Sequence, residues 1–105
     1  LRYVRSGAIA TIAVIAEGKA EVIEMKAMPE SKVTAAPLSK LGFPRGAVIG
    51  SVVRGREVFI PDGDFQIQAE DDCIIFTFLD TLPQVEKFFA GKQKSLFDSL
   101  TRAFK

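Results

Sequence analysis

The chain has 105 residues, and this length favours a single domain. Hydrophobic residues make up 48% of it and charged residues 26%, a composition that excludes a disordered or fibrous chain. Fourteen Lys and Arg residues against thirteen Asp and Glu residues give a net charge of +1. This balance argues against a nucleic-acid-binding module, which normally carries a strongly basic surface.

The residue types that are missing exclude several kinds of catalysis. The chain has no His and a single Cys, Cys73. It therefore has no His general base, no Ser-His-Asp or Cys-His nucleophile pair and no zinc site of the usual Cys and His ligands. One thiol cannot form a disulfide within the chain, which favours a reducing compartment. This pattern indicates a binding or regulatory domain and not an enzyme.

The beginning of the chain is neither a signal peptide nor a membrane span. Its longest uncharged stretch, residues 6–16, has 11 residues, short of the roughly 20 that cross a bilayer. We interpret residues 1–18 as a linker and the end of a preceding domain, 19–91 as the main domain and 92–105 as an amphipathic tail helix. For the apolar residues between 9 and 15 two readings stay open. In the first reading they belong to an element of a preceding domain, which would bury part of their apolar surface. In the second they form a strand of this domain's own sheet.

The next elements are a strand, a loop and a short helix. Residues 21–28 alternate charged and apolar side chains for part of their length, which predicts a strand with one buried face. Pro29 ends this strand, and the composition of residues 29–37 is typical of a loop. Residues 37–42 predict a short helical segment that stops at Gly42.

Four further strands are predicted in the middle of the chain. Two β-branched apolar runs, 47–53 and 57–61, flank a short polar connection that contains Gly55, and this pattern predicts a β-hairpin. Residues 65–68 alternate apolar and polar side chains and predict a short edge strand. Residues 73–79 are almost entirely apolar, which predicts a central strand covered on both faces. Within it, Cys73 is interpreted as a small core residue, because no basic side chain adjoins it to hold a thiolate.

The last third of the chain predicts helices. Apolar residues at helical spacing predict a helix with Thr81 as its N-cap, Pro83 in its first turn and Gly91 at its end. A second amphipathic pattern predicts a last helix over 96–104. The whole is an α+β fold, a small and mainly antiparallel sheet with two to three helices.

A cluster of acidic residues is a candidate cation site, but we interpret these residues as solvated turn residues. Carboxylates could supply oxygen ligands to calcium, but these side chains fall on two separate turns and lack EF-hand spacing. We therefore predict no metal site. The glycines also form no phosphate-binding loop. The five acidic residues are Asp62, Asp64, Glu70, Asp71 and Asp72.

Arg54 and Arg56, at the tip of the predicted hairpin, are the strongest candidate ligand-binding residues. Their guanidinium groups could bind phosphate or carboxylate groups. The alternative is an ordinary charged turn in which one of them pairs with Glu57. On either reading Arg54 is a surface residue, and its replacement by alanine is expected to change stability by only about 0.5 kcal/mol.

Nine Phe residues are many for a small domain, which buries only somewhat more than about 60% of its unfolded surface. Some of them are expected at a subunit or domain interface, where aromatic anchors concentrate. The modestly basic stretch 92–105 could contact an anionic membrane or a partner protein, and folding back onto the core is the favoured alternative.

Five motifs follow one another in a fixed order along most of the chain. They are AEVIE (20–24), SKV (31–33), LxxPxGAxIGxxxRGxEVxIPxGD (41–64), DxIxF (72–76) and VExxF (85–89). In this order and spacing the chain resembles the TrkA-C domain, the C-terminal module of RCK-type regulators of potassium conductance, and most closely that of Trk potassium uptake systems. Residues 4–7 are similar to the end of the preceding nucleotide-binding Rossmann domain.

The resemblance implies a regulatory, non-enzymatic domain in the cytoplasm, at the inner face of the cell membrane. Such modules form homodimers beneath a membrane subunit that conducts potassium, and they transmit a ligand-driven change of shape to it. The Rossmann domains bind NAD(H) or ATP/ADP, so no cofactor is expected within residues 19–91 unless this module takes a ligand of its own. Two alternatives stay open: the same module in another cation transporter or antiporter, and a free-standing small-molecule sensor.

In some relatives this module binds cyclic di-AMP at its dimer interface. Carried over by position, the resemblance implies a site of Arg54, Val48 and Ile60, with Arg56 as a neighbour. Phe59 replaces the polar side chain that those relatives offer beside the isoleucine. Glycine is also usual at two positions that are Ala35 and Asp71 here, and a left-handed backbone at either would be strained.

Overall fold

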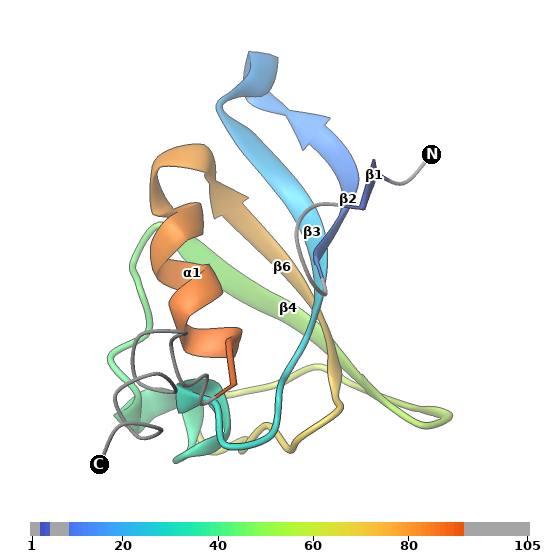
Figure 1. Cartoon of the computed structure of the whole chain (residues 1–105), viewed down its shortest axis with the longest axis vertical. Coiled ribbons are helices and arrows are strands. Elements are labelled where there is room, and N and C mark those ends of the chain that lie inside the picture. The colour runs from blue at the N-terminus through green and yellow to red at the C-terminus, as the bar shows by residue number, and fades with distance from the viewer. Residues whose placement is uncertain (1–2, 5–8, 92–105) are drawn as a thin grey trace, which may run out of the picture.

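The computed structural model describes residues 3–4 and 9–91, and within them one α-helix lies against one antiparallel sheet (Figure 1). The strands are β1 (Tyr3–Val4), β2 (Ile9–Ile15), β3 (Ala20–Lys26), β4 (Ala47–Arg54), β5 (Glu57–Phe59) and β6 (Asp72–Phe78). They lie in the order β1-β2-β3-β6-β4-β5, and every neighbouring pair is antiparallel. The predicted α+β class with an antiparallel sheet is confirmed.

Strand β2 decides between the two readings of residues 9–15. It pairs with β3 from Ile9, opposite Met25, to Ile15, opposite Ala20. These residues therefore form a strand of this domain's own sheet. The expected boundary between residues 1–18 and 19–91 falls inside the hairpin of β2 and β3.

The predicted hairpin of β4 and β5 is confirmed. Gly55 lies in its connection with a φ of +61°, a left-handed conformation that glycine adopts without strain. Strand β6 is central, between β3 and β4, as its apolar run predicted. The prediction that both faces of β6 are covered is wrong, because Phe76 and Phe78 are 48% and 58% exposed.

Helix α1 (Leu82–Phe89) packs against one face of the sheet and is the one predicted helix that the described residues confirm. Its buried residues Leu82, Val85 and Phe89 recur at the spacing of one helical face, as predicted. Thr81 precedes the helix, but its side chain makes no capping hydrogen bond. None of the helices in the described part of the chain is long and apolar enough to span a bilayer.

The other two predicted helices have different outcomes. Residues 37–42 form only a single 3-10 turn, Leu38–Lys40, because Pro37 has extended backbone angles and Gly42 is left-handed with a φ of +66°. The helix predicted over 96–104, and with it the tail 92–105, lies outside the described residues.

The predicted edge strand over residues 65–68 is wrong. This segment belongs to an irregular loop, residues 60–71, whose backbone groups bond to other segments. The carbonyl O of Phe65 accepts from the N–H of Leu38 at 3.0 Å, and the N–H of Gln68 donates to a side chain. The apolar and polar alternation reflects the insertion of Ile67 into the core, where it is fully buried, and not pairing within a sheet.

The hydrophobic core lies between α1 and the sheet. Ile23, Ile75 and Ile49 lie opposite one another on β3, β6 and β4, and they face Val85 and Phe89 of the helix. The side of the sheet that faces α1 is called the core face below, and the opposite side the open face. This one-sided packing determines where functional surface is available.

Candidate functional site

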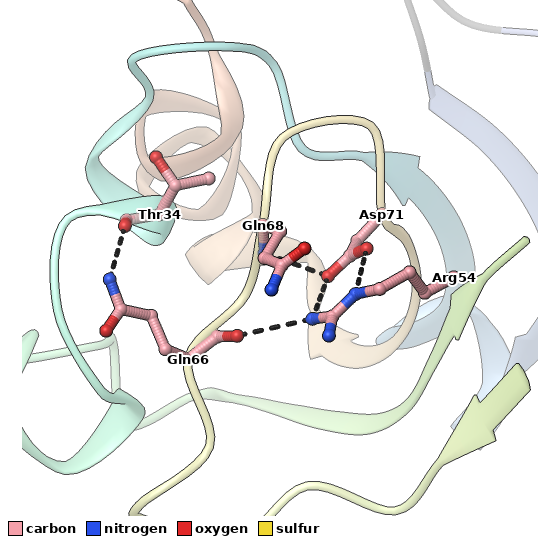
Figure 2. A network of polar contacts seen from close by, with 5 residues as sticks. All are labelled: Thr34, Arg54, Gln66, Gln68 and Asp71. Atoms are coloured by element: carbon pink, nitrogen blue, oxygen red, sulfur yellow. Dashed lines mark hydrogen bonds and ion pairs between the residues drawn. The ribbon is translucent and has the colours of Figure 1, made fainter.

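Arg54, at the end of β4, forms an ion pair with Asp71, at the end of loop 60–71 (Figure 2). Nε of Arg54 donates to Oδ1 of Asp71 at 2.9 Å, and Nη2 donates to Oδ2 at 2.8 Å. The guanidinium therefore binds the carboxylate through two parallel hydrogen bonds, the strongest geometry for this pair. Oδ2 also accepts from the backbone N–H of Gln68 at 2.9 Å, and Nη2 donates to the backbone O of Gln66 at 3.3 Å.

The surroundings of this pair favour its charged form. The Asp71 side chain is 1% exposed and that of Arg54 30%. Burial by itself disfavours the charged carboxylate, but the hydrogen bonds from Arg54 and Gln68 outweigh it, so the pKa of Asp71 is lowered. The guanidinium carbon of Arg54 lies 5.0 Å from the ring centroid of Phe59 and 5.4 Å from that of Phe65, within the range of cation–π attraction.

We call Arg54, Asp71, Phe59 and Phe65 the arginine clamp. The clamp fastens loop 60–71 to the β4–β5 hairpin beside its turn, and the backbone O of Asp71 also accepts from the N–H of Ala27 at 2.8 Å. Arg54 is 30% exposed and held by groups of its own chain, which changes the effect expected from its replacement. Its guanidinium is already occupied by groups of this chain.

The structure does not bring the four candidate ligand residues together. The pairing of β4 with β6 shifts between Ile49 and Ser51, so a bulge at Gly50 reverses which side chains face the core. Val48, 62% exposed, therefore lies on the open face with Phe76, whereas Arg54 lies on the side of the core face. Arg56 is exposed in the turn of the hairpin, and Ile60, which is 80% exposed, follows β5 at the opposite end of that strand. Nothing described here tests the cyclic di-AMP site, and it stays a prediction.

The acidic residues serve local structure in the described part of the chain. Asp62 caps its own turn through a hydrogen bond from the N–H of Asp64 at 3.0 Å. Asp72 pairs with Lys26 at 3.4 Å, and Asp71 belongs to the clamp. Within residues 9–91 no three acidic or Cys side chains come together as a metal site requires.

The two departures from the glycine pattern have simple structural outcomes. Ala35 has a φ of −77°, so no glycine is needed there. Asp71 provides the carboxylate of the clamp, and the left-handed position of this turn falls instead on Glu70, with a φ of +76°. The strain of a non-glycine residue is thus located one position earlier than expected.

The single thiol, Cys73, is fully buried on β6, as predicted. Burial raises the pKa of this thiol to about 12, and the negative charges of Asp71 and Asp72 add to the effect. We expect no reaction with Ellman's reagent at pH 8 in the folded protein and a full reaction after unfolding in guanidinium chloride. Because only the unfolded thiol ionises between its ordinary value near pH 9 and about pH 12, stability also falls across that range. Rapid labelling of the native protein would contradict this assignment.

The open face of the sheet is the largest feature that local structure leaves unused. Val22, Phe76 and Val48 lie opposite one another across β3, β6 and β4, and Phe78 follows on β6. Both Phe side chains and Val48 are about half exposed or more. A solvated sheet face normally presents polar side chains, so this one has the composition of an interface.

Comparison with known proteins finds relatives that align with most of this chain. The chain is 39% identical over 89 residues to "Trk system potassium uptake protein TrkA homolog 1" of Methanosarcina mazei, which covers 85% of this chain. It is 34% identical over 89 residues to "Trk system potassium uptake protein TrkA" of Azorhizobium caulinodans, and 30% identical over 93 residues to that of Haemophilus influenzae, each over 85% of this chain. The chain spans only about a fifth of the length of these proteins. No family profile matches it.

The motifs coincide with folded elements. The hairpin motif forms β4 and β5, the DxIxF motif is the start of β6, and the VExxF motif supplies two of the three buried residues of α1, Val85 and Phe89. The chain is a TrkA-C-like domain of the Trk potassium uptake proteins.

Proposed function

We propose that this chain is a cytoplasmic regulatory module of a potassium uptake system. It dimerises, carries out no reaction itself and transmits a change of shape to a membrane subunit that conducts potassium. Its place is at the inner face of the membrane, through that partner. Coupling of this kind requires a ligand that binds one shape of the assembly more tightly than the other.

The observation that carries the proposal is the identity of 30–40% to Trk potassium uptake proteins over most of the chain. The geometry is consistent with this role. The ionisable groups of the clamp are paired within the chain, whereas the exposed aromatic face is available for another protein surface. A module with these features acts through contacts and not through bond-making chemistry.

A potassium uptake assay in Haemophilus influenzae tests the proposal. In its Trk protein the segment that aligns with this chain is exchanged for this chain, and growth and potassium uptake are measured at limiting potassium. We expect uptake well above that of a strain in which the segment is deleted, because the exchanged module keeps the dimerising surface and the fold.

The control is an exchange for an unrelated antiparallel domain of similar size, which we expect to behave like the deletion. A chimera that is present at the normal level but transports no better than the deletion contradicts the proposal.

A further inference from the structure

We infer that the tail, residues 92–105, packs against residues 9–91 of the same chain, on the surface where α1 ends. Residues 9–91 are called the body below. The inference goes beyond the proposed function and does not rest on it, because every observation that carries it concerns this chain alone. The docking surface, called the exit surface, consists of Met28, Glu30, Phe43, Glu70 and Phe88.

The first argument is the place where the body ends, at Gly91. The end of α1 lies beside the segment that follows β3 (Figure 1), and the N–H of Met28 donates to the O of Phe89 at 3.2 Å. A Cβ atom on Gly91 would lie 3.3 Å from the Cβ of Met28 and 3.3 Å from the O of Pro29. Gly91 is therefore in contact with this segment, and the tail starts against it.

The second argument is a pair of exposed carboxylates, one on either side of this starting point. Glu30 lies two residues after Met28. On the other side, the N–H of Glu70 donates at 2.7 Å to the O of Ala27, the residue before Met28. Neither carboxylate forms an ion pair with a lysine or arginine of the body. The tail therefore starts between two negative charges that the body does not neutralise.

The third argument is the unequal division of charge between the body and the tail. Residues 9–91 contain eight Lys and Arg against twelve Asp and Glu, whereas residues 92–105 contain four against one. The net charges are therefore −4 and +3, and the two parts attract each other. Lys92 and Lys94 follow Gly91 within three residues, at most about 10 Å along an extended chain, so both can reach the carboxylates of Glu30 and Glu70.

The fourth argument is the apolar part of the exit surface. Met28 is a large apolar residue that is 38% exposed. Phe43 and Phe88 are partly exposed, and their ring centroids are 5.3 Å apart. Lys32 also lies here, with its Nζ 5.9 Å from the centroid of the Phe88 ring, so the two carboxylates outnumber the one cation beside this apolar strip in the body.

The sequence of the tail matches this strip. Leu96, Leu100 and Phe104 recur every four residues, and Phe97 is next to the first of them. On a helix these side chains would share one side, with the basic residues around them. The tail therefore offers apolar side chains to Met28, Phe43 and Phe88 and positive charges to the carboxylates beside them.

Two other occupants of the exit surface fit less well. An anionic membrane attracts the tail but repels the negatively charged body to which the tail is attached. A second copy would have to compete with a segment that is joined to this surface by four residues, 92–95. Such a short flexible connection gives an effective concentration of the order of millimolar, far above the micromolar concentration of a second copy.

Chymotrypsin cleavage after Phe97, followed by mass spectrometry on the 105-residue chain, tests the inference. We expect cleavage to be at least about 10-fold slower than in a synthetic peptide of residues 92–105, because a protease cuts a packed segment only when it opens. Cleavage as fast as in the peptide overturns the inference.

Charge reversal tests whether the exit surface is the site. Glu30→Lys/Glu70→Lys should bring the cleavage rate close to that of the peptide, and adding Lys92→Glu/Lys94→Glu should restore the protection, which a misfolded body could not do. Both glutamates have a left-handed backbone, with φ of +63° and +76°, and lysine is likewise an unbranched side chain, so the reversal does not alter the type of backbone strain. Acceleration without restoration overturns the inference.

The matched control is Glu17→Lys/Glu57→Lys, which makes the same change of net charge at two exposed positions in the β2–β3 and β4–β5 hairpins. Its cleavage rate should equal that of the unchanged chain. If the control is cleaved as fast as Glu30→Lys/Glu70→Lys, the overall charge and not the exit surface holds the tail, and the assignment is overturned.

Two further measurements distinguish the other occupants. Protection should be equal at protein concentrations of about 1 and about 100 µM, because binding within one chain does not depend on concentration. Protection that grows with concentration places the tail on a second copy and overturns the inference. An unprotected tail in a chain that cosediments with phosphatidylglycerol vesicles overturns it in favour of a membrane.

Discussion

Replacement of Arg54 by alanine is expected to lower the free energy of unfolding by about 3 kcal/mol. The carboxylate of Asp71 is almost fully buried, and without Arg54 it would keep only the hydrogen bond from Gln68. Loss of one partner of a buried ion pair typically costs about 3–5 kcal/mol, and the partial exposure of Arg54 favours the lower end of this range. For a domain of about 100 residues the melting temperature should fall by roughly 10–20 °C.

The control is Arg56→Ala, two residues away in the same hairpin. Arg56 is exposed, so we expect its replacement to change stability by less than about 0.5 kcal/mol. A double-mutant cycle with Asp71→Ala should give a coupling of about 1–3 kcal/mol, because each substitution removes the same contact. If the two arginine variants melt at the same temperature, the clamp contributes nothing and Arg54 is free for a ligand.

The pH dependence of this difference follows from the lowered pKa of Asp71. A carboxyl group whose pKa is lowered by folding stabilises the protein above its unfolded value, near 3.8, and loses this contribution as the pH falls through the folded value. In Arg54→Ala the effect of burial on Asp71 is no longer opposed by the guanidinium, so its pKa rises and protonation stabilises the variant at a higher pH than it affects the unchanged chain. The difference between the two proteins should therefore shrink as the pH falls from neutral. Equilibrium unfolding in urea at several pH values measures it.

The elements that the sequence predicts well are those whose signal is local. The alternation in β3, the apolar run of β6 and the glycine between β4 and β5 each arise from neighbouring residues, and all four strands are present. The helix over 82–89 is likewise predicted by its spacing of buried residues. Residues 65–68 show the limit of this reasoning, since a single inserted side chain, Ile67, produces the same alternation as a strand.

The arginine clamp and the open face depend on relations that no local pattern contains. Arg54 and Asp71 are 17 residues apart, and their pairing requires both the hairpin and the loop to be in place. The bulge at Gly50 reverses the alternation of β4. Strict alternation along a regular strand would place Val48 and Arg54 on the same face of the sheet, whereas they lie on opposite faces. The exposure of Phe76 also cannot be read from an apolar run, because the same run fits a strand that is covered on both faces. The abundance of Phe predicts an interface but does not locate it.

Gly46→Ala is the second substitution with a large expected effect, a loss of about 3 kcal/mol in the free energy of unfolding. Gly46 lies directly before β4, and its carbonyl O accepts from the N–H of Phe78 at 3.0 Å. A Cβ atom at this position would overlap Oγ1 of Thr81 and lie 2.9 Å from its Cβ. The clash therefore involves the residue that leads into α1, and relief would require the start of the helix to move away from the sheet.

Removal of the opposing side chain tests whether this clash is the cause. The double variant Gly46→Ala/Thr81→Gly should regain at least about 1 kcal/mol relative to the sum of the two single variants. Gly42→Ala is the matched control: no atom lies within 4 Å of its added Cβ, and its φ of +66° makes the cost, about 1 kcal/mol, one of backbone strain. That cost should not change with Thr81→Gly. Thermal unfolding of the unchanged chain, the three single variants and the two double variants separates the two mechanisms, and strict additivity at both glycines would show that Gly46 is needed for a reason other than space.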